Sequence, residues 1–100
     1  AAVSNFTQWL AVHFSKVGIR CNAIAPGFLV TAQNEKLLFD NDGNPTPRAD
    51  KILRNTPMGR FGESNELVGG VFFLADSTLA SFVNGVVLPI DGGFAAYSGV

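Results

Sequence analysis

The first sixteen residues carry apolar side chains at the spacing of one helix face. At about 100° per residue these positions form a single stripe, which consists of Ala2, Val3, Phe6, Trp9, Leu10, His13 and Phe14. The pattern predicts a helix over 1–16 that ends near Gly18. The opposite arc is polar but uncharged, so we expect it to contact another protein surface rather than water.

Two short segments have the pattern of β-strands. Residues 19–25 are mostly apolar and are followed by Pro26 and Gly27, which end strands. Residues 85–90 alternate apolar side chains over a second strand. Pro89 has no N–H to donate to a sheet, so we expect 85–90 to be an edge strand.

A second helix is predicted from Glu63 or Ser64 to about Ala75. Glu66 falls in its first turn, where a negative charge interacts favourably with the helix dipole. The Gly-Gly pair at 69–70 should cost roughly 1 kcal/mol per glycine relative to alanine. Glycines in this place suggest that another backbone approaches closely, as at a contact between subunits.

Residues 28–62 differ from the rest of the chain because Asn, Asp, Pro, Thr and five of the seven basic residues gather there. Short helices are predicted over 31–39 and 48–55, separated by the turn-rich segment 40–47. Excursions of this length inside a compact domain are usually lids or binding segments. We therefore interpret 28–62 as a substrate lid.

The predicted elements indicate an α/β fold. Two strands joined through helices favour parallel pairing, and a parallel sheet is normally covered by helices on both faces. The 100 residues do not supply enough helices for that. We therefore expect residues 1–100 to be an incomplete part of one domain of a longer chain.

Composition narrows the functional classes. With 47% hydrophobic and 15% charged residues the chain is typical of a globular domain, and a net charge of −1 does not favour nucleic acid as a partner. No apolar run reaches the roughly 20 residues of a membrane span. One cysteine, Cys21, and one histidine, His13, give no metal-ligand set, and they fit a reducing, cytoplasmic location.

The segment 22–31 carries the sharpest local motif, a strand that ends in Pro-Gly and is followed by a threonine. In open α/β sheets, ligands bind beyond the carboxyl ends of the strands. Gly27 lets a ligand approach the backbone, and Thr31 offers a hydroxyl donor. The alternative is an ordinary turn that only ends a strand.

Four segments, in this order and spacing, resemble the C-terminal part of short-chain dehydrogenases/reductases: GIRCNAIAPG at 18–27, PMGRFG at 57–62, ELVGGVFFL at 66–74 and NGVVLPIDGG at 84–93. The resemblance implies a Rossmann-type doubly wound parallel sheet, of which this chain holds the C-terminal portion. It implies hydride transfer between NAD or NADP and a carbonyl or hydroxyl substrate. It also implies a homotetramer.

The same resemblance assigns roles to a few residues. By the family pattern Pro-Gly-x-Ile/Val-x-Thr, the main chain of Leu29 meets the nicotinamide carboxamide and the hydroxyl of Thr31 reaches the cofactor. Pro26 and Gly27 would shape that approach. Leucine departs from the usual Ile or Val, which matters little for a main-chain contact. The family's catalytic Ser, Tyr and Lys are expected upstream of Ala1, so no catalytic residue is assigned here.

The substrate assignment rests on the lid and on the ending at 94–100, which are similar to bacterial members that interconvert D-fructuronate and D-mannonate. A sugar-acid carboxylate needs a guanidinium partner, and Arg48 opens the helix that carries Lys51 and Arg54. Phe28 is a second candidate for substrate contact. The alternative for these basic residues is a solvated helix face.

Three other functions stay open. The parent protein could reduce another carbonyl, such as a ketogluconate or an acyl-carrier thioester. It could be a non-catalytic scaffold that keeps the fold without the chemistry. The chain could also be a free-standing binding or dimerisation domain, which would unfold cooperatively in isolation. We expect instead that the isolated 100 residues neither turn over substrate nor bind nucleotide well.

Overall fold

The computed structural model describes residues 1–99, and these divide into two compact units. The first unit consists of 1–25 and 68–89, and the second of 26–67 with the residues from 90 onward.

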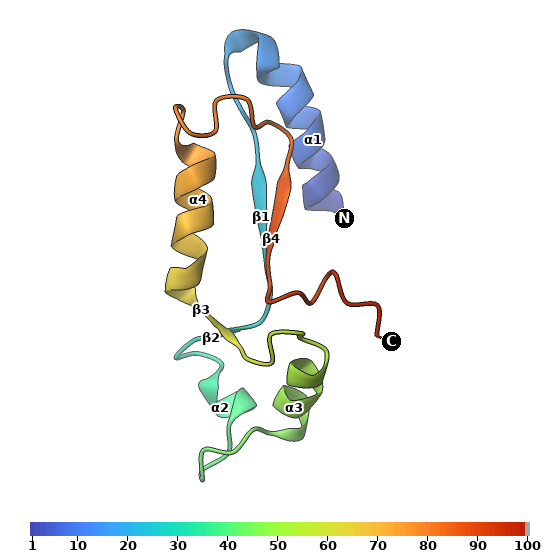
Figure 1. Cartoon of the computed structure of the whole chain (residues 1–100), viewed down its shortest axis with the longest axis vertical. Helices are drawn as coiled ribbons and strands as arrows, with labels where there is room; N and C mark the ends of the chain where they lie inside the picture. The colour runs from blue at the N-terminus through green and yellow to red at the C-terminus, as the bar shows by residue number, and fades with distance from the viewer. Residues whose placement is uncertain (100) are drawn as a thin grey trace. The chain divides into compact units, whose positions relative to one another are not determined.

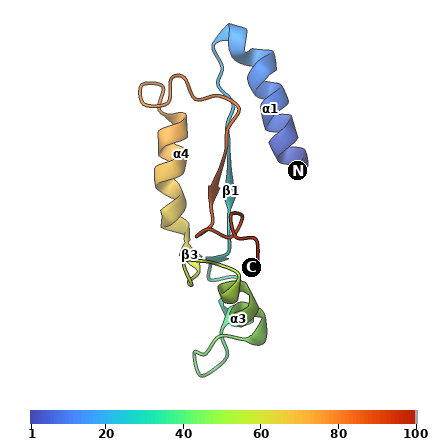
Figure 2. The same cartoon turned by 45° about the vertical axis from the view of Figure 1, so that its right-hand side comes forward.

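The first unit contains two helices and the greater part of a two-stranded sheet. Its elements are α1 (Ala2–Phe14), the 3-10 turn η1 (Ser15–Val17), β1 (Ala23–Pro26), α4 (Val68–Ala75) and β4 (Val87–Ile90). Figures 1 and 2 show β1 and β4 side by side, with α1 on one side of them and α4 on the other. This order of helix, sheet and helix matches the predicted α/β class.

The two strands run parallel. The N–H of Ala23 donates to the Val86 carbonyl and that of Gly27 to the Ile90 carbonyl, both at 2.9 Å. β1 begins later than predicted, at Ala23 rather than near residue 19. The reason lies in asparagine side chains, because the Cys21 N–H donates to Asn84 Oδ1 at 2.9 Å instead of to a strand.

Helix α1 forms as predicted, but it turns a different face to its own chain. Thr7 and Ala11, on or next to the polar arc, are its buried residues. Ala11 is small enough for a close approach, since a Cβ placed on Gly85 would lie 3.4 Å from the Ala11 Cβ. Asn84 Nδ2 also donates to the Ala11 carbonyl at 3.1 Å. The uncharged arc therefore contacts this chain itself.

The apolar stripe of α1 is exposed among the described residues. Phe6 and Trp9 are 58% and 55% exposed, and the Trp9 ring stacks on His13 at 4.6 Å between centroids. Large apolar side chains of α4 are exposed too, namely Val68, Val71, Phe72 and Phe73. This agrees with the expectation that these residues do not cover their own sheet.

Helix α4 is preceded by the 3-10 turn η2 (Ser64–Leu67), so the predicted helix from 63 or 64 to 75 forms in two parts. Nothing in the described chain lies within 4 Å of a Cβ placed on Gly69. The close backbone approach expected at the Gly-Gly pair is therefore not observed at Gly69, and a contact between subunits stays a prediction.

In the second unit, the segment 28–62 is closed at its base by two short strands. Strand β2 (Leu29–Val30) pairs in parallel with β3 (Gly62–Glu63), with Leu29 opposite Gly62. This pairing was not predicted from the sequence. Because the β2–β3 pair joins the two ends of the segment 28–62, the base of this segment is held by main-chain hydrogen bonds.

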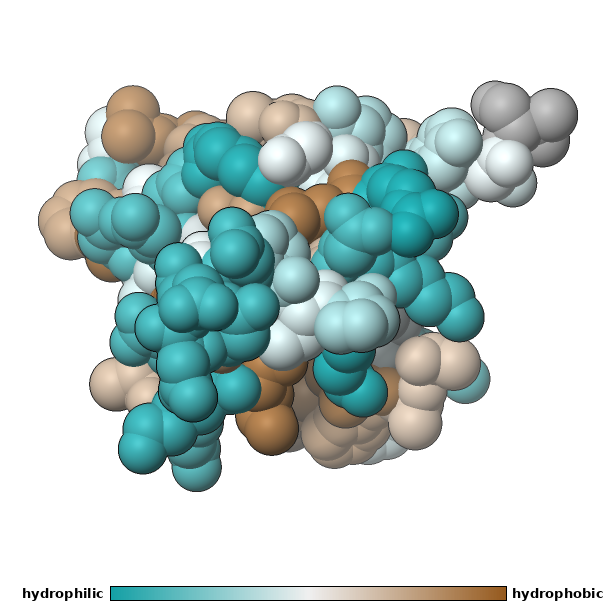
Figure 3. Space-filling model, turned by 90° about the horizontal axis from the view of Figure 1, so that it is seen from below, coloured by the Kyte–Doolittle hydropathy of each residue, from teal (hydrophilic) through white to brown (hydrophobic). Residues whose placement is uncertain are grey.

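Between those strands lie α2 (Glu35–Leu38) and α3 (Pro47–Arg54). Both fall inside the helices predicted over 31–39 and 48–55, apart from one residue at the start of α3. Thr46 caps α3 by accepting from the Ala49 N–H at 3.3 Å. The segment has a small core of its own, formed by Leu38, Ala49 and Phe61 with Val30, Phe39, Ile52 and Leu53 packed against it. Figure 3, which looks at the molecule from below, shows apolar side chains at the surface between polar ones.

An ion pair fixes the turn that follows this core. Arg60 Nη1 donates to Glu66 Oε1 at 2.7 Å and Arg60 Nη2 to Glu66 Oε2 at 2.9 Å. The Glu63 N–H also donates to Glu66 Oε1 at 3.0 Å. These three donors stabilise the ionised carboxylate and lower the pKa of Glu66 to about 2.

The lowered pKa predicts an acid-dependent contribution to stability. A carboxylate whose pKa is depressed by folding contributes stability above its ordinary pKa of 4.5, and the contribution is lost as the pH falls toward 2. In the full-length protein, Glu66→Gln should lower the urea midpoint at neutral pH and leave it little changed near pH 2. Urea titrations across this range, with the exposed Glu35→Gln as control, measure the difference. A Glu66→Gln deficit that did not shrink in acid would contradict the assignment.

Candidate functional site

A pocket of about 310 Å³ lies in the second unit, beyond the end of β1. Its lining residues are Gly27, Phe28, Leu29, Thr31, Asn34, Leu37, Leu38, Arg48 and Ile52. The structure thus brings together five of the six residues proposed from sequence. Pro26, the sixth, is exposed at the end of β1 and does not line the pocket.

Gly27 lies where a side chain has no room. A Cβ placed on it would be 2.6 Å from Asp91 Cα and 2.7 Å from Asp91 Cβ. Asp91 itself is held by its own turn, because Oδ1 accepts from the Gly93 N–H and Oδ2 from the Ala95 N–H, both at 2.9 Å. Glycine is therefore required to pass the chain from β1 into the pocket wall.

The main chain of Leu29 keeps one donor free. Gly62 donates its N–H to the Phe28 carbonyl at 3.0 Å. In a parallel ladder, Gly62 then bonds to the residues on either side of its partner Leu29, and the polar groups of Leu29 itself point away from β3. The Leu29 carbonyl accepts from Asn34 Nδ2 at 2.8 Å. The Leu29 N–H has no acceptor among residues 1–99.

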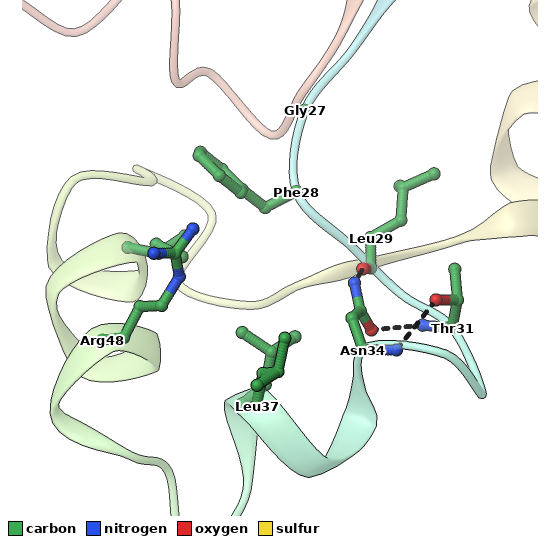
Figure 4. A pocket seen from close by; sticks show the side chains of 9 residues that line it. Gly27, Phe28, Leu29, Thr31, Asn34, Leu37 and Arg48 are labelled. Atoms are coloured by element: carbon green, nitrogen blue, oxygen red, sulfur yellow. Dashed lines mark hydrogen bonds between the residues drawn. The ribbon is translucent and has the colours of Figure 1, made fainter.

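Thr31 and Asn34 bond to each other reciprocally, in the manner of a capping box. The Thr31 N–H donates to Asn34 Oδ1 at 2.8 Å, and the Asn34 N–H donates to Thr31 Oγ1 at 3.3 Å. Figure 4 shows Asn34 between Leu29 and Thr31, with these hydrogen bonds dashed. The Thr31 hydroxyl accepts here, so its own hydrogen is left to donate.

Sequence reasoning missed Asn34. The signal was present in the spacing Thr31-Ala-Gln-Asn34, which places a polar side chain three residues after a capping threonine. Three apolar residues that also line the pocket were not proposed as site residues, namely Leu37, Leu38 and Ile52. From sequence alone, an apolar residue in a short helix is equally consistent with a place in the core.

Arg48 and Phe28 lie on the side of the pocket opposite the Leu29–Asn34 cluster in the view of Figure 4. Arg48 is exposed and takes part in no ion pair within the described part of the chain. Arg54, by contrast, is paired with Asp50 on the same helix. Of the basic residues on this helix, Arg48 is the one that lines the pocket, and its role as a substrate contact stays a prediction beside the solvated-face alternative.

The Phe28 ring packs against Phe94, which lies in the segment that follows β4. Its ring meets that of Phe94 edge to face, with centroids 5.2 Å apart and planes at 72°. Phe94 follows the Asp91 turn, and its N–H donates to the Asp91 carbonyl at 3.2 Å. The position of the Phe28 ring at the pocket is thus tied to the turn that also crowds Gly27.

Residues 1–99 were also compared with the requirements of a metal site and of a membrane span. No group of three or more His, Cys, Asp or Glu side chains there could hold a metal ion. No helix in this range has the length and apolar character needed to cross a membrane. Cys21 is a half-buried free thiol.

A comparison with protein-family models matches residues 1–95 to the family described as Enoyl-(Acyl carrier protein) reductase. A relative from Haemophilus influenzae, named only as an uncharacterized oxidoreductase, is 75% identical over the whole chain, which covers 35% of that relative. Gluconate 5-dehydrogenase of Gluconobacter oxydans is 40% identical over 92% of the chain, which covers 34% of the enzyme. The chain thus spans about a third of the length of the curated relatives it matches.

A solved structure extends the comparison to three dimensions. A Haemophilus influenzae protein, provisionally named a D-mannonate oxidoreductase and solved with bound NAD, superposes with a TM-score of 0.92 at 75% identity. The match covers 99% of this chain and 35% of that one. Further matching structures were solved with NADP. The fold prediction of a Rossmann-type α/β portion is confirmed, and the chain belongs to the short-chain dehydrogenase/reductase family.

Proposed function

We propose that this chain is the cofactor- and substrate-facing part of an NAD(P)-dependent oxidoreductase that acts on a sugar acid, with D-fructuronate and D-mannonate as the favoured pair. The observation that carries the proposal is the pair of uncommitted donors at the pocket, the Leu29 N–H and the Thr31 hydroxyl. The names of the sugar-acid relatives support the substrate class.

The residues present fit a dinucleotide. Gly27 lets the main chain pass without a side chain, at the end of a parallel strand where such folds bind ligands. The Leu29 N–H would donate to the carboxamide oxygen, and the Thr31 hydroxyl to another cofactor oxygen. The nicotinamide supplies or accepts the hydride. In this proposal, the chain contributes by holding the nicotinamide ring and by keeping the reacting carbon of the substrate close to it.

The substrate would lie between the cofactor side of the pocket and α3. Arg48 would hold the sugar-acid carboxylate, and Phe28 would limit the width of the pocket. The segment 28–62 would exclude water as a lid, now with a base fixed by the β2–β3 pair. The acid that protonates the carbonyl oxygen is proposed to lie upstream of Ala1.

The test is turnover by the full-length protein with NADH or NADPH, followed through the absorbance of the reduced nicotinamide. D-fructuronate, 5-ketogluconate and a 3-oxoacyl thioester are offered separately. We expect the highest kcat/KM with D-fructuronate. A preference for ketogluconate or for the thioester would correct the substrate, while no turnover with any carbonyl, together with no nucleotide binding, would favour the scaffold. The isolated residues 1–100 should show no turnover.

Two further parts of the proposal concern the setting of the enzyme. We propose a cytoplasmic homotetramer, in which the exposed apolar faces of α1 and α4 are covered by other parts of the assembly. Light scattering of the full-length protein measures the oligomeric state, and a monomer would contradict it.

A further inference from the structure

Asn34 is the one polar side chain at the pocket to which no role has been given so far. We infer that Asn34 is a positioning residue, which orients the Leu29 main chain and the Thr31 hydroxyl toward the nicotinamide end of the cofactor. The inference rests on the proposed function, because it assumes that a nicotinamide cofactor binds at these two donors.

The Asn34 amide bonds to the main chain of both neighbouring pocket residues. Nδ2 donates to the Leu29 carbonyl and Oδ1 accepts from the Thr31 N–H, both at 2.8 Å. One side chain thus ties together two residues that would each contact the cofactor. Because both bonds end on the same planar amide, the Leu29 and Thr31 main chains cannot shift independently.

The second step concerns which hydrogen-bonding groups remain. Asn34 occupies the Leu29 carbonyl and the Thr31 N–H, and its own N–H occupies a lone pair of Thr31 Oγ1 at 3.3 Å. What the cluster leaves over is two donors, the Leu29 N–H and the Thr31 O–H. The pocket wall is therefore set to bind acceptor oxygens, as a carboxamide or a phosphate would present.

The third step is the choice of side chain. The amide carries a donor nitrogen and an acceptor oxygen as two separate atoms of one neutral planar group, which is what the two neighbours require. Aspartate has the same shape but would place a carboxylate oxygen against the Leu29 carbonyl oxygen, so that repulsion replaces a bond. Asn34→Asp is therefore a nearly isosteric change that removes the hydrogen bond to the Leu29 carbonyl.

The experiment compares ligands that contain different ends of the cofactor. NAD, NADP and AMP affinities of the full-length protein are measured by calorimetry for the wild type and for Asn34→Asp. Losing one neutral hydrogen bond should weaken binding of the preferred dinucleotide by roughly threefold to tenfold. AMP carries only the adenine end and should bind as before. Asn34→Ala, which adds no charge, should change affinity in the same direction.

Gln33→Glu is the matched control, because it adds the same charge on the neighbouring exposed residue without touching the cluster. It should leave all three affinities unchanged. A pH series adds a readout that general destabilisation would not give. Lowering the pH from about 8 to about 5 begins to protonate an aspartate that faces a carbonyl oxygen, and the acid O–H can then donate as Nδ2 does. Dinucleotide affinity of Asn34→Asp should recover in part, while that of the wild type should not rise.

The outcomes separate the inference from the proposed function. If the wild type binds neither NAD nor NADP, the inference and the proposed function are both wrong. If the wild type binds a dinucleotide and Asn34→Asp binds it equally well, the inference alone is wrong. An equal loss of dinucleotide and AMP affinity, with no recovery at lower pH, would also overturn it, since Asn34 would then only support the fold.

Discussion

Replacing Gly27 with alanine should destabilise the full-length protein by about 1–3 kcal/mol, as overpacking of a filled site usually does. The added Cβ would meet Asp91 Cα at 2.6 Å and Asp91 Cβ at 2.7 Å, and neither atom belongs to a flexible side-chain end. Either β1 or the Asp91 turn must move. Because Gly27 lines the pocket, we expect dinucleotide affinity to fall together with the melting temperature.

Differential scanning calorimetry and nucleotide titration measure the two effects. Ser77→Thr is the control, since it adds one methyl group to an exposed residue outside the pocket and outside the Gly-Gly pair at 69–70, where a contact between subunits is predicted. Substitutions at such surface positions usually change stability by less than about 0.5 kcal/mol, so this variant should melt and bind nucleotide as the wild type does. A Gly27→Ala protein with unchanged melting and unchanged nucleotide binding would contradict the crowding at Asp91.

The helices could be predicted from sequence because their signals are local. The apolar period of α1 acts within one or two turns. The Thr46-Pro47 start of α3 is local too, although both residues were assigned to the turn 40–47 and the helix was predicted to begin at 48. The pair of β2 and β3 could not be predicted, since two-residue strands carry no alternation and their partners are far apart in the chain. The buried face of α1 was not predicted either. The helix contacts the chain near Gly85 through the small Ala11, while its aromatic stripe stays exposed.

The position of the candidate site in the fold could be predicted from the sequence. The end of a parallel strand indicated Gly27 and Thr31, the family resemblance added Leu29, and the pocket contains all three. What could not be predicted was the geometry that gives these residues their capacity to bind. The free N–H of Leu29 depends on its register with Gly62, and the free hydroxyl hydrogen of Thr31 depends on Asn34.

Replacing Arg48 with glutamine should raise the KM for a sugar-acid substrate by about tenfold, with a smaller change in kcat. A hydrogen bond to a charged group contributes about 1.5–3 kcal/mol, and the exposure of Arg48 favours the lower end of that range. The loss should be specific to the carboxylate. An uncharged ketose of the same chain length lacks this partner, so its KM should be the same for Arg48→Gln and the wild type.

Two variants on the same helix sharpen this test. Arg48→Lys keeps the charge but loses the planar fork that binds a carboxylate through two parallel hydrogen bonds, so its KM should lie between those of the wild type and Arg48→Gln. Arg54→Gln removes a basic residue that is already paired with Asp50 and should leave KM unchanged. If Arg48→Gln impaired the charged and the uncharged substrate equally, Arg48 would act through the packing of α3 and not through the substrate carboxylate.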